Sequence, residues 1–370
     1  MLHKKIGYGF LLNMLFIWSG NANISYNNFN VNITEKVIVD SIEHPKNPEL
    51  KVYFFRPENT YKPLPVIYFC HGIGATNPQT YRFLIDYIVA NNVCVCYSTC
   101  DPVLAAITPR VAYTHLWKGF VAGHKKWKQF IDNRRIGIVG HSYGGGAAAN
   151  IAWKAVHQKK WGKNGCFVYI MAPWYCYGMN SNRFNEFPKH TILVTQVFED
   201  DNINDYRMAC DIYRSFGIPK DRKCFITVFS AKNGSTKVEA DHGVPEVRKT
   251  ENLLGKYVVF PVIDSLLYYA FDESFNSHPN TQKRRYQLRT TGAEQGWECR
   301  FIKDNTCALK QPQSNYINFW GHSMNPRIKG TRAMPRILRL GLHTPQTIIR
   351  YCALGLGRMD KDKENAAEKN

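Results

Sequence analysis

The chain has 370 residues, of which 44% are hydrophobic and 14% aromatic, and this composition excludes a disordered protein. Its 48 Lys and Arg residues outnumber 29 Asp and Glu residues, which gives a formal net charge of +19 at pH 7. The length allows one large domain with an appendage, or two domains, and the apolar runs are too short for a polytopic membrane protein.

The first 22 residues have the layout of a signal peptide. Lys4 and Lys5 form a short basic start, residues 6–18 are an apolar stretch, and small residues follow at 20–22. The apolar stretch is too short to cross about 30 Å of hydrocarbon as a helix, which argues against a permanent membrane anchor. We therefore predict that residues 1–22 are a signal peptide and that the protein is exported, either periplasmic or secreted.

Between residues 36 and 272, short apolar runs rich in β-branched residues alternate with longer segments of helical period. This alternation predicts an α/β domain with a mostly parallel sheet covered by helices on both faces. The predicted strands are Val37–Ser41, Lys51–Phe55, Val66–Cys70, Val93–Tyr97, Ile136–Val139, Phe167–Met171, Ile192–Val197 and Phe225–Phe229. The predicted helices are Pro78–Asn91, Val103–Phe130, Gly144–Gln158, Asp205–Phe216 and Leu254–Ala270.

The pattern of strands and helices fades after Asp272, so we treat residues 273–370 as a C-terminal extension. Residues 281–358 hold 14 Lys and Arg against 3 Asp and Glu, which is +11 of the net +19. This extension could form a surface for anionic lipid, envelope polysaccharide or another polyanion, or a solvated basic surface. No nucleic-acid-binding motif accompanies the charge, so nucleic acid is not an expected partner. The basic residues considered are Arg284, Arg285, Arg289, Arg327, Lys329, Arg332, Arg336 and Arg339.

Eleven cysteines in an exported protein favour disulfides, although the odd count leaves at least one thiol free or bonded to another molecule. Cys70, Cys94 and Cys96 lie in predicted strands and are expected to be buried thiols. Cys299 and Cys307 flank a polar loop and are the predicted bridged pair. The sequence has no Cys-x-x-Cys motif and no zinc-like His/Cys spacing, so no metal site is expected.

The segment after residue 135 reads as a buried strand, a sharp turn and a helix of small residues. Residues 140–144 spell Gly-His-Ser-Tyr-Gly directly after the strand Ile136–Val139, and a Gly/Ala-rich helix follows. A nucleophile elbow requires this context, because small flanking residues let strand and helix approach closely while the Ser backbone is held in a strained turn. We predict that Ser142 is a catalytic nucleophile. The alternative is a glycine-rich turn with a buried serine.

A serine nucleophile also needs donors that stabilise the oxyanion formed by its attack. Residues 71–74 read His-Gly-Ile-Gly after the strand Val66–Cys70, like the His-Gly turn whose next N–H points toward the nucleophile. The backbone N–H groups of Ile73 and Tyr143 are therefore the predicted oxyanion hole. His71 itself is expected to be structural, beneath the turn.

The predicted general base is His242, which would accept the proton of Ser142. It follows Asp241, twelve residues after the last predicted core strand, and Gly243 and Pro245 mark its segment as a loop. Other histidines lie inside predicted helices or in the extension and compete poorly: His115, His124, His157, His278, His322 and His343.

The acid that orients the imidazole is expected in the segment after the strand Ile192–Val197. Two carboxylates, Asp200 and Asp201, compete for this role. We expect Asn204 to cap a helix that begins at Asp205. Counting back from that cap places Asp201 at the turn where the orienting acid usually lies, so we prefer Asp201 over Asp200.

The order Ser142, Asp201, His242, with a His-Gly turn after an early strand and an elbow after a central one, resembles the α/β-hydrolase family. The resemblance covers residues 36–272. Within the family, the chain most resembles exported bacterial serine esterases related to dienelactone hydrolases, polyester hydrolases and lipases. It implies an α/β-hydrolase fold with a mostly parallel central sheet. It also implies hydrolysis of a small-molecule, lipid or polymer ester through an acyl-enzyme, with neither metal nor cofactor.

Two segments depart from that family's usual pattern. Gln196-Val197 stands where many members end the acid strand with a His-Gly or Gly-x pair, which leaves the acid open. Ala172–Lys189 is too short for a large helical cap and is rich in aromatic residues. We interpret it as an aromatic wall beside an open cleft. The alternative is an aromatic loop that packs into the core.

Three functions fit these motifs. The first is a carboxylic ester hydrolase. The second keeps the nucleophile but transfers the acyl group to another acceptor or attacks an amide, which gives an acyltransferase or a peptidase. The third is a non-catalytic binding module on a hydrolase scaffold, and a complete Ser, Asp and His set argues against it. Specificity depends on pocket shape, so the motifs do not select one ester.

Overall fold

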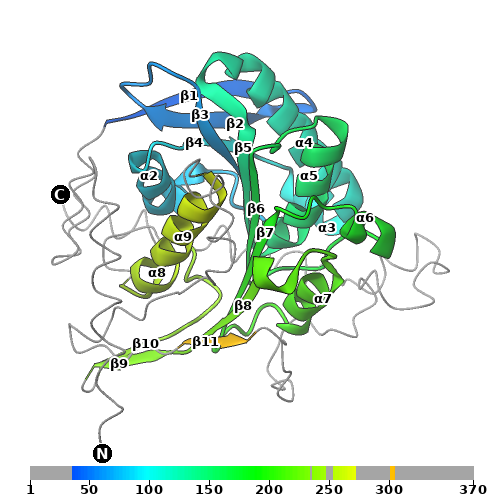
Figure 1. Ribbon diagram of the computed structural model, residues 1–370. Helices are drawn as coiled ribbons and strands as arrows, with labels where there is room; N and C mark the ends of the chain where they lie inside the picture. Colours follow the sequence, from blue (N-terminus) through cyan, green and yellow to red (C-terminus); the bar gives the residue numbers. More distant parts are fainter. Residues whose placement is uncertain (1–35, 234–235, 247–252, 272–300, 305–370) are drawn as a thin grey trace, which may run out of the picture.

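Within residues 36–233, 236–246, 253–271 and 301–304, which the computed structural model describes, a twisted sheet of nine strands runs through the middle of the protein (Figure 1). The strand order is β1-β2-β4-β3-β5-β6-β7-β8-β11, and β9 and β10 form a separate two-stranded ribbon. The strands are β1 Val37–His44, β2 Asn47–Pro57, β3 Leu64–Cys70, β4 Cys94–Ser98, β5 Ile131–His141, β6 Gly165–Met171, β7 Ile192–Phe198, β8 Lys223–Val228, β9 Ala231–Asn233, β10 Thr236–Val238 and β11 Phe301–Asp304.

Most neighbouring strands of the sheet run in the same direction. Along the order β4-β3-β5-β6-β7-β8 every pairing is parallel. The pairings β1 with β2, β2 with β4, and β8 with β11 are antiparallel. The carboxyl ends of β3, β5, β7 and β8 therefore meet at one edge of the sheet, which is the edge that the predicted site residues follow.

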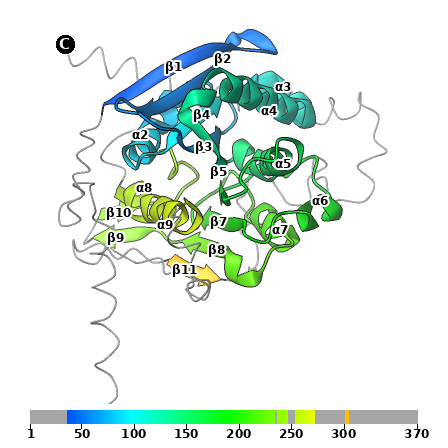
Figure 2. The ribbon, with the colours of Figure 1, turned by 45° about the horizontal axis from the view of Figure 1, so that its top comes forward.

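Helices cover both faces of the sheet. Helices α2, α8 and α9 lie on one face, and α3 to α7 lie on the other (Figure 1 and Figure 2). The α-helices are α2 Arg82–Ala90, α3 Pro102–Ile107, α4 Pro109–Lys126, α5 Tyr143–Gln158, α6 Ser181–Asn185, α7 Arg207–Ser215, α8 Leu253–Val258 and α9 Phe260–Phe271. The 3-10 helices are η2 Pro78–Tyr81, η3 Lys128–Phe130 and η4 Lys220–Arg222.

The two covered faces explain why the central strands are apolar at nearly every position. Strands β3, β4, β6 and β7 are buried along their whole length. One apolar cluster packs beneath α4, α5 and α7 and includes Leu116 and Ile151. The other packs beneath α2 and α9 and includes Leu84 and Ile263. Each strand thus supplies side chains to two cores, as a parallel sheet between two helical layers requires.

The α/β architecture predicted from the sequence is confirmed, and each of the eight predicted strands is present. The single long helix predicted over Val103–Phe130 is wrong, because the chain breaks at Thr108 into α3 and α4. Pro109 disfavours helical backbone in the residue before it, and Thr108 accordingly has φ −135° and ψ 67°. The helix predicted over Leu254–Ala270 is likewise divided, into α8 and α9.

Strand β11 comes from the segment predicted as a basic extension, and it pairs with β8 at the end of the sheet (Figure 1). Phe301 lies opposite Val228, and Asp304 lies opposite Phe225. This part of the extension therefore completes the sheet. The basic residues considered for an anionic partner and the predicted signal peptide lie outside the described residues, so export and binding to a polyanion remain predictions.

Cysteines within the described residues are mostly thiols of the protein interior. Cys210 is disulfide-bonded, whereas the predicted pair Cys299 and Cys307 lies outside the described residues. Burial raises the pKa of the Cys94 thiol to about 12, which keeps it protonated and unreactive. The buried cysteines that are not in a disulfide are Cys70, Cys94, Cys96, Cys100, Cys166, Cys176 and Cys224.

In the part of the chain that the structure describes, one helical stretch, Leu254–Phe271, is long and apolar enough to cross a membrane by length and composition alone. It comprises α8 and α9, and 72% of it is buried inside the protein. Its apolar side chains, among them Val262 and Leu266, belong to the core cluster that also includes residues of α2. Packing in the protein core therefore explains why α8 and α9 are so apolar.

Glycines allow β5, α5 and β3 to approach closely, and Gly144→Ala is expected to destabilise the protein by roughly 3 kcal/mol. An ideal Cβ at Gly144 would lie 2.0 Å from the carbonyl oxygen of Cys70 and 2.6 Å from that of His71, so the backbone itself would have to move. Chemical denaturation followed by circular dichroism measures the loss.

The matched control for this substitution is Gly74→Ala. Gly74 has φ +80° but no atom within 4 Å of an added Cβ, so only the backbone strain should be felt, at about 1 kcal/mol. Equal losses of unfolding free energy in the two variants would contradict the close-approach explanation.

Candidate active site

Ser142 lies in the sharp turn between β5 and α5, with φ 55° and ψ −121°. A non-glycine residue reaches this region of backbone space only at a cost of about 1–3 kcal/mol, so neighbouring structure has to hold it there. The Ser142 N–H donates to the carbonyl of Met171 at 3.0 Å, and its carbonyl accepts from the N–H groups of Gly146 at 3.1 Å and Trp174 at 2.8 Å. The turn is thus fixed from β6, from α5 and from the segment after β6.

His242 and Asp201 come together at the carboxyl edge of the sheet. The Nδ1–H of His242 donates to Oδ2 of Asp201 at 2.9 Å. Asp201 is only 5% exposed, and its other oxygen accepts from the N–H groups of Ile203 at 2.9 Å and Asn204 at 3.1 Å. The carboxylate is therefore fixed by its own loop in the position where it meets the imidazole.

Asp200, the competing acid, points to a different partner. Its side chain accepts a short hydrogen bond from the hydroxyl of Ser230, and its backbone N–H donates to the carbonyl of Ala240 at 2.9 Å. These contacts join the loop after β7 to the segment after β8. The imidazole of His242 contacts Asp201 and not Asp200.

The surroundings of His242 change its basicity in two opposing ways. Burial acts to lower the pKa of the imidazole, because a charged ring loses hydration. The charge of Asp201 and its hydrogen bond outweigh burial, with further help from Glu246 and Asp241, so the pKa lies above 6.5. The site therefore stabilises an imidazolium ion at this position.

The base loop lies directly against the elbow. The ring centroids of His242 and His141 are 4.7 Å apart, and His141 Nε2 is 2.9 Å from the backbone oxygen of His242. Within the described residues no hydrogen bond joins the Ser142 hydroxyl to the His242 ring. Such contacts are often long in ligand-free enzymes and tighten only when substrate binds.

Two backbone N–H groups, one in the turn after β3 and one at the elbow, have no protein acceptor within the described residues. In the described part of the chain, neither the N–H of Ile73 nor that of Tyr143 donates to a protein acceptor. Tyr143 is the first residue of α5, where helical N–H groups have no partner within the helix and favour negative charge. These are the two groups that the sequence predicts as oxyanion donors.

His71 fixes the peptide that carries the Ile73 N–H. Its Nε2 accepts from the N–H of Cys100 at 3.2 Å, so Nδ1 carries the hydrogen and donates to the carbonyl of Gly72 at 2.6 Å. Burial lowers the pKa of His71 to about 4, so the ring stays neutral. Because a trans peptide is planar, the N–H of Ile73 points away from the carbonyl that His71 holds. The structural role expected for His71 fits these contacts.

The sheet order, the strained serine between β5 and α5, and a His–Asp pair supplied after β8 and β7 together decide the fold. The chain has the α/β-hydrolase fold. It is similar to carboxyl esterase 2 from the mycorrhizal fungus Tuber melanosporum, with 16% identity, a TM-score of 0.48 and coverage of 68% of this chain and 90% of that one. It is also similar to a mutant of esterase rPPE, with 18% identity, a TM-score of 0.42 and coverage of 61% and 81%. Neither a protein-family model nor a curated protein sequence matches the chain.

Asn204 lies at the candidate site, and the sequence analysis did not place it there. Its side-chain amide lies 3.5 Å from the Ser142 hydroxyl and donates to the carbonyl of Ala172 at 2.9 Å. The predicted capping role is wrong, because α7 begins at Arg207, whose N–H is accepted by Asp205. The signal that could have identified Asn204 is its position three residues after Asp201, within the same buried turn.

Asn204→Ala is expected to lower kcat for a short p-nitrophenyl ester about tenfold, because the serine hydroxyl loses a donor that holds it in place. The matched control is Asn202→Ala, since Asn202 lies in the same loop but is exposed. Steady-state kinetics with both variants test the assignment. Equal kcat values for the two variants would show that Asn204 has no part in the site.

The aromatic segment after β6 packs into the core of the protein, so the interpretation as an aromatic wall beside a cleft is wrong for most of its members. Only Trp174 is half-buried, and its N–H is the one that binds the Ser142 carbonyl. Burial of the aromatic residues against α5 and α7 explains their abundance. The buried aromatic members are Tyr175, Tyr177, Phe184 and Phe187, and Met179 of the same segment is buried with them.

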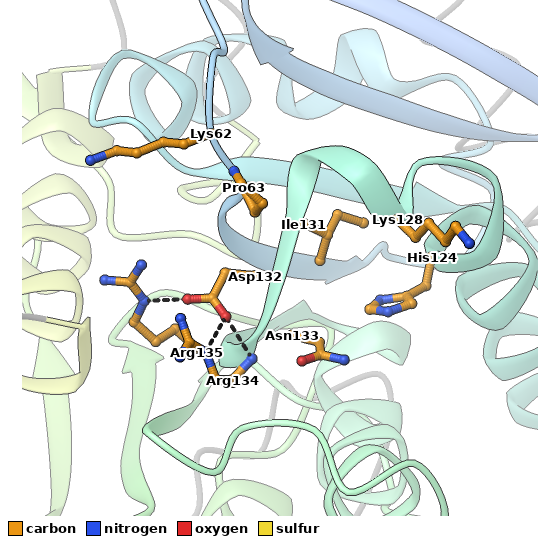
Figure 3. Close-up of a pocket in the computed structure, with 9 residues that line it drawn as sticks. All are labelled: Lys62, Pro63, His124, Lys128, Ile131, Asp132, Asn133, Arg134 and Arg135. Atoms are coloured by element: carbon orange, nitrogen blue, oxygen red, sulfur yellow. Dashed lines mark hydrogen bonds and ion pairs between the residues drawn. The ribbon is translucent and has the colours of Figure 1, made fainter.

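A hollow of about 420 Å³ lies at the amino ends of β3 and β5 (Figure 3). Ser142 follows the carboxyl end of β5, at the opposite edge of the sheet. The lining of the hollow is mostly basic. Arg134 and Arg135 both bond to Asp132, at 3.0 Å and 2.8 Å, and the ammonium groups of its two lysines point away from each other in Figure 3. The polar groups do not converge on one point, and we assign no function to this hollow.

No group of three or more His, Cys, Asp or Glu side chains within the described ranges is arranged to hold a metal ion. The carboxyl edge of the sheet carries the Ser142 hydroxyl, an imidazole paired with a carboxylate, and two backbone N–H groups that donate to no acceptor within the described residues. This set can carry out nucleophilic attack, proton transfer and stabilisation of an oxyanion.

Proposed function

We propose that the protein is a serine hydrolase that cleaves carboxylic esters through an acyl-enzyme. Ser142 is the nucleophile, His242 the general base, Asp201 the orienting acid, and the N–H groups of Ile73 and Tyr143 form the oxyanion hole. The observation that carries the proposal is the 2.9 Å contact between His242 and Asp201, made by a loop that is bonded to the residue before the strained serine. The proposal needs neither a metal nor a cofactor.

In the first half of the reaction the ester is cleaved and its acyl group is bound to the enzyme. His242 donates its Nδ1–H to Asp201, so its Nε2 is free to take the proton of Ser142. The serine oxygen bonds to the ester carbonyl carbon, and the carbonyl electron pair moves onto oxygen, which the two backbone N–H groups bind. The intermediate then expels the alcohol, which takes the proton from His242.

In the second half, water replaces the alcohol. His242 takes a proton from water, the resulting hydroxide oxygen bonds to the acyl carbon, and the same oxyanion hole binds the negative oxygen. The bond to the Ser142 oxygen then breaks, and that oxygen takes the proton back from His242. The products are a carboxylic acid and the free enzyme, and Asp201 stabilises the imidazolium in both halves.

Backbone strain at Ser142 favours catalysis over a non-catalytic binding module. A residue with φ 55° and ψ −121° costs free energy that packing alone does not require, and such strain is concentrated at functional sites. A binding scaffold would have no need of a serine in this conformation beside a buried His–Asp pair. The strained backbone of Ser142, together with the His242–Asp201 pair, therefore supports a catalytic role for Ser142.

The test is covalent labelling with a fluorophosphonate, combined with hydrolysis of p-nitrophenyl esters of increasing acyl length. We expect one label per chain at Ser142, located by mass spectrometry, and release of p-nitrophenol. Absence of labelling would contradict the proposal. Added alcohols or amines distinguish simple hydrolysis from the alternatives, because an acyltransferase would form a new ester or amide and a peptidase would cleave the corresponding amide.

A further inference from the structure

A buried chain of hydrogen bonds joins the three segments that carry the proposed chemistry. The N–H of Gly72 lies 3.0 Å from the hydroxyl of Tyr81, that hydroxyl lies 2.8 Å from Nδ1 of His141, and Nε2 of His141 lies 2.9 Å from the carbonyl oxygen of His242. Tyr81 and His141 are both 0% exposed. The chain therefore runs from the oxyanion turn, through the elbow, to the loop of the base.

The direction of every bond in this chain is determined by its two ends. The carbonyl of His242 can only accept, so Nε2 of His141 carries the ring hydrogen. In the neutral ring Nδ1 is then an acceptor, and the hydroxyl of Tyr81 donates to it. The same hydroxyl oxygen accepts from the N–H of Gly72, which can only donate. The three contacts are satisfied together when His141 is neutral and carries its hydrogen on Nε2.

Protonation of His141 would break this arrangement. A second ring hydrogen on Nδ1 would face the hydroxyl of Tyr81, which would then have to turn its own hydrogen away from His141. The surroundings also disfavour protonation. Burial lowers the pKa of His141, and the adjacent His242 lowers it further, to well below 6.5. The ring is thus neutral and held as one tautomer while His242 gains and loses protons beside it.

We propose that His141, oriented by Tyr81, is a positioning residue that holds the base loop and the oxyanion turn in register around Ser142; this inference rests on the proposed esterase function. His141 touches no reacting atom. On one side, its Nε2–H donates to the backbone carbonyl of His242 and so fixes the loop of the base. On the other side, it orients the Tyr81 hydroxyl, which accepts from the N–H of Gly72. The carbonyl of Gly72 and the N–H of Ile73 belong to the same peptide group, so this contact also fixes the oxyanion donor. One side chain therefore sets the separation between base, nucleophile and oxyanion donor.

Two amide substitutions test the role of Nε2 separately from that of Nδ1. The side-chain nitrogen of Gln reaches the place of Nε2, whereas that of Asn reaches only the place of Nδ1. His141→Gln is therefore expected to keep kcat within about fivefold of the unaltered enzyme. His141→Asn is expected to lower kcat about 100-fold with KM nearly unchanged, because the base loop loses its attachment.

Tyr81→Phe tests the other end of the chain. It keeps the ring but removes both hydroxyl bonds, and we expect kcat to fall about tenfold. The matched control is Tyr87→Phe, since the hydroxyl of Tyr87 donates to Asp264 of helix α9 at 2.7 Å and not to a segment of the site. The control should lose thermal stability without losing kcat. If kcat in all four variants fell only in proportion to thermal stability, the positioning role would be refuted.

Nitrogen NMR of the His141 ring separates this inference from the proposed function. We expect a neutral ring with hydrogen on Nε2 from pH 5 to pH 8, and a change in its Nδ1 resonance in Tyr81→Phe. A ring that titrates in this range, or carries its hydrogen on Nδ1, would overturn the inference even in an active esterase. The expected tautomer in a protein that neither labels nor hydrolyses esters would leave the hydrogen-bond chain intact, and the proposed function and the positioning role would both fail.

Discussion

Ser142→Ala is expected to lower kcat for p-nitrophenyl acetate on the order of 10⁶-fold, because no other atom at the elbow can form the acyl-enzyme. The turn itself should survive, since the hydrogen bonds that hold it use the backbone of Ser142 rather than its hydroxyl. Steady-state release of p-nitrophenol and a fluorophosphonate gel on the same samples measure the effect. The thermal midpoint of unfolding should change little.

Ser265→Ala is the matched control for the nucleophile. Its hydroxyl donates to the carbonyl of Pro261 one turn earlier in α9, and α9 covers the opposite face of the sheet from α5. This variant should hydrolyse esters and accept the label as the unaltered protein does. Hydrolysis that persists in Ser142→Ala at the normal rate would show that the site described above is not the site of reaction.

Asp201→Asn is expected to lower kcat about 10⁴-fold while leaving the loop folded. An Asn oxygen can still accept from the N–H groups of Ile203 and Asn204, but its amide group would donate toward His242 Nδ1. The imidazole would then carry its hydrogen on Nε2, the atom that must accept the serine proton. The wrong tautomer, rather than a loss of packing, produces the effect.

Asp200→Asn is the control, because Asp200 bonds to Ser230 and not to the imidazole. Its kcat should stay within about threefold of that of the unaltered enzyme, because the substitution changes only a hydrogen bond outside the His242–Asp201 pair. A larger loss in Asp200→Asn than in Asp201→Asn would assign the orienting acid to Asp200 instead.

Activity and stability are expected to respond in opposite directions to the raised pKa of His242. Since the base must be neutral to accept a proton, kcat/KM should rise with pH through a midpoint above 6.5. The stability that the imidazolium gains from Asp201 is fully present below the unfolded pKa of about 6.5 and is lost as pH rises through the folded pKa. Asp201→Asn removes the charge that raises the pKa, so the remaining activity should have its acid midpoint at lower pH.

Elements with a local signal could be predicted from the sequence. Strands such as β3 and β7 are continuous apolar runs, and a parallel sheet buried on both faces requires such runs. The elbow could be predicted because close packing between β5 and α5 demands glycines at fixed places, among them Gly140 and Gly144. In each case the physical requirement acts on residues that are adjacent in the chain.

Features that depend on distant partners could not be predicted. His141 bonds to the loop of His242 across 101 positions of sequence, and nothing in the local pattern around either residue indicates this. The local sequence predicts that Asn204 caps a helix, because Asn commonly has that role, whereas the fold places its amide 3.5 Å from the Ser142 hydroxyl. The aromatic residues after β6 gave no signal of burial, since aromatic side chains suit a cleft and a core equally well.

The pairing of β11 with β8 affects how a truncation of the chain after residue 272 is interpreted. A protein ending at residue 272 would keep every group proposed for the reaction, but it would leave the backbone of Phe225–Val228 without its antiparallel partner. An uncovered strand edge is a template on which a second molecule can add its own strand. We therefore expect a chain ending at residue 272 to self-associate through β8. A loss of activity in that chain would not by itself show that residues 273–370 take part in the reaction.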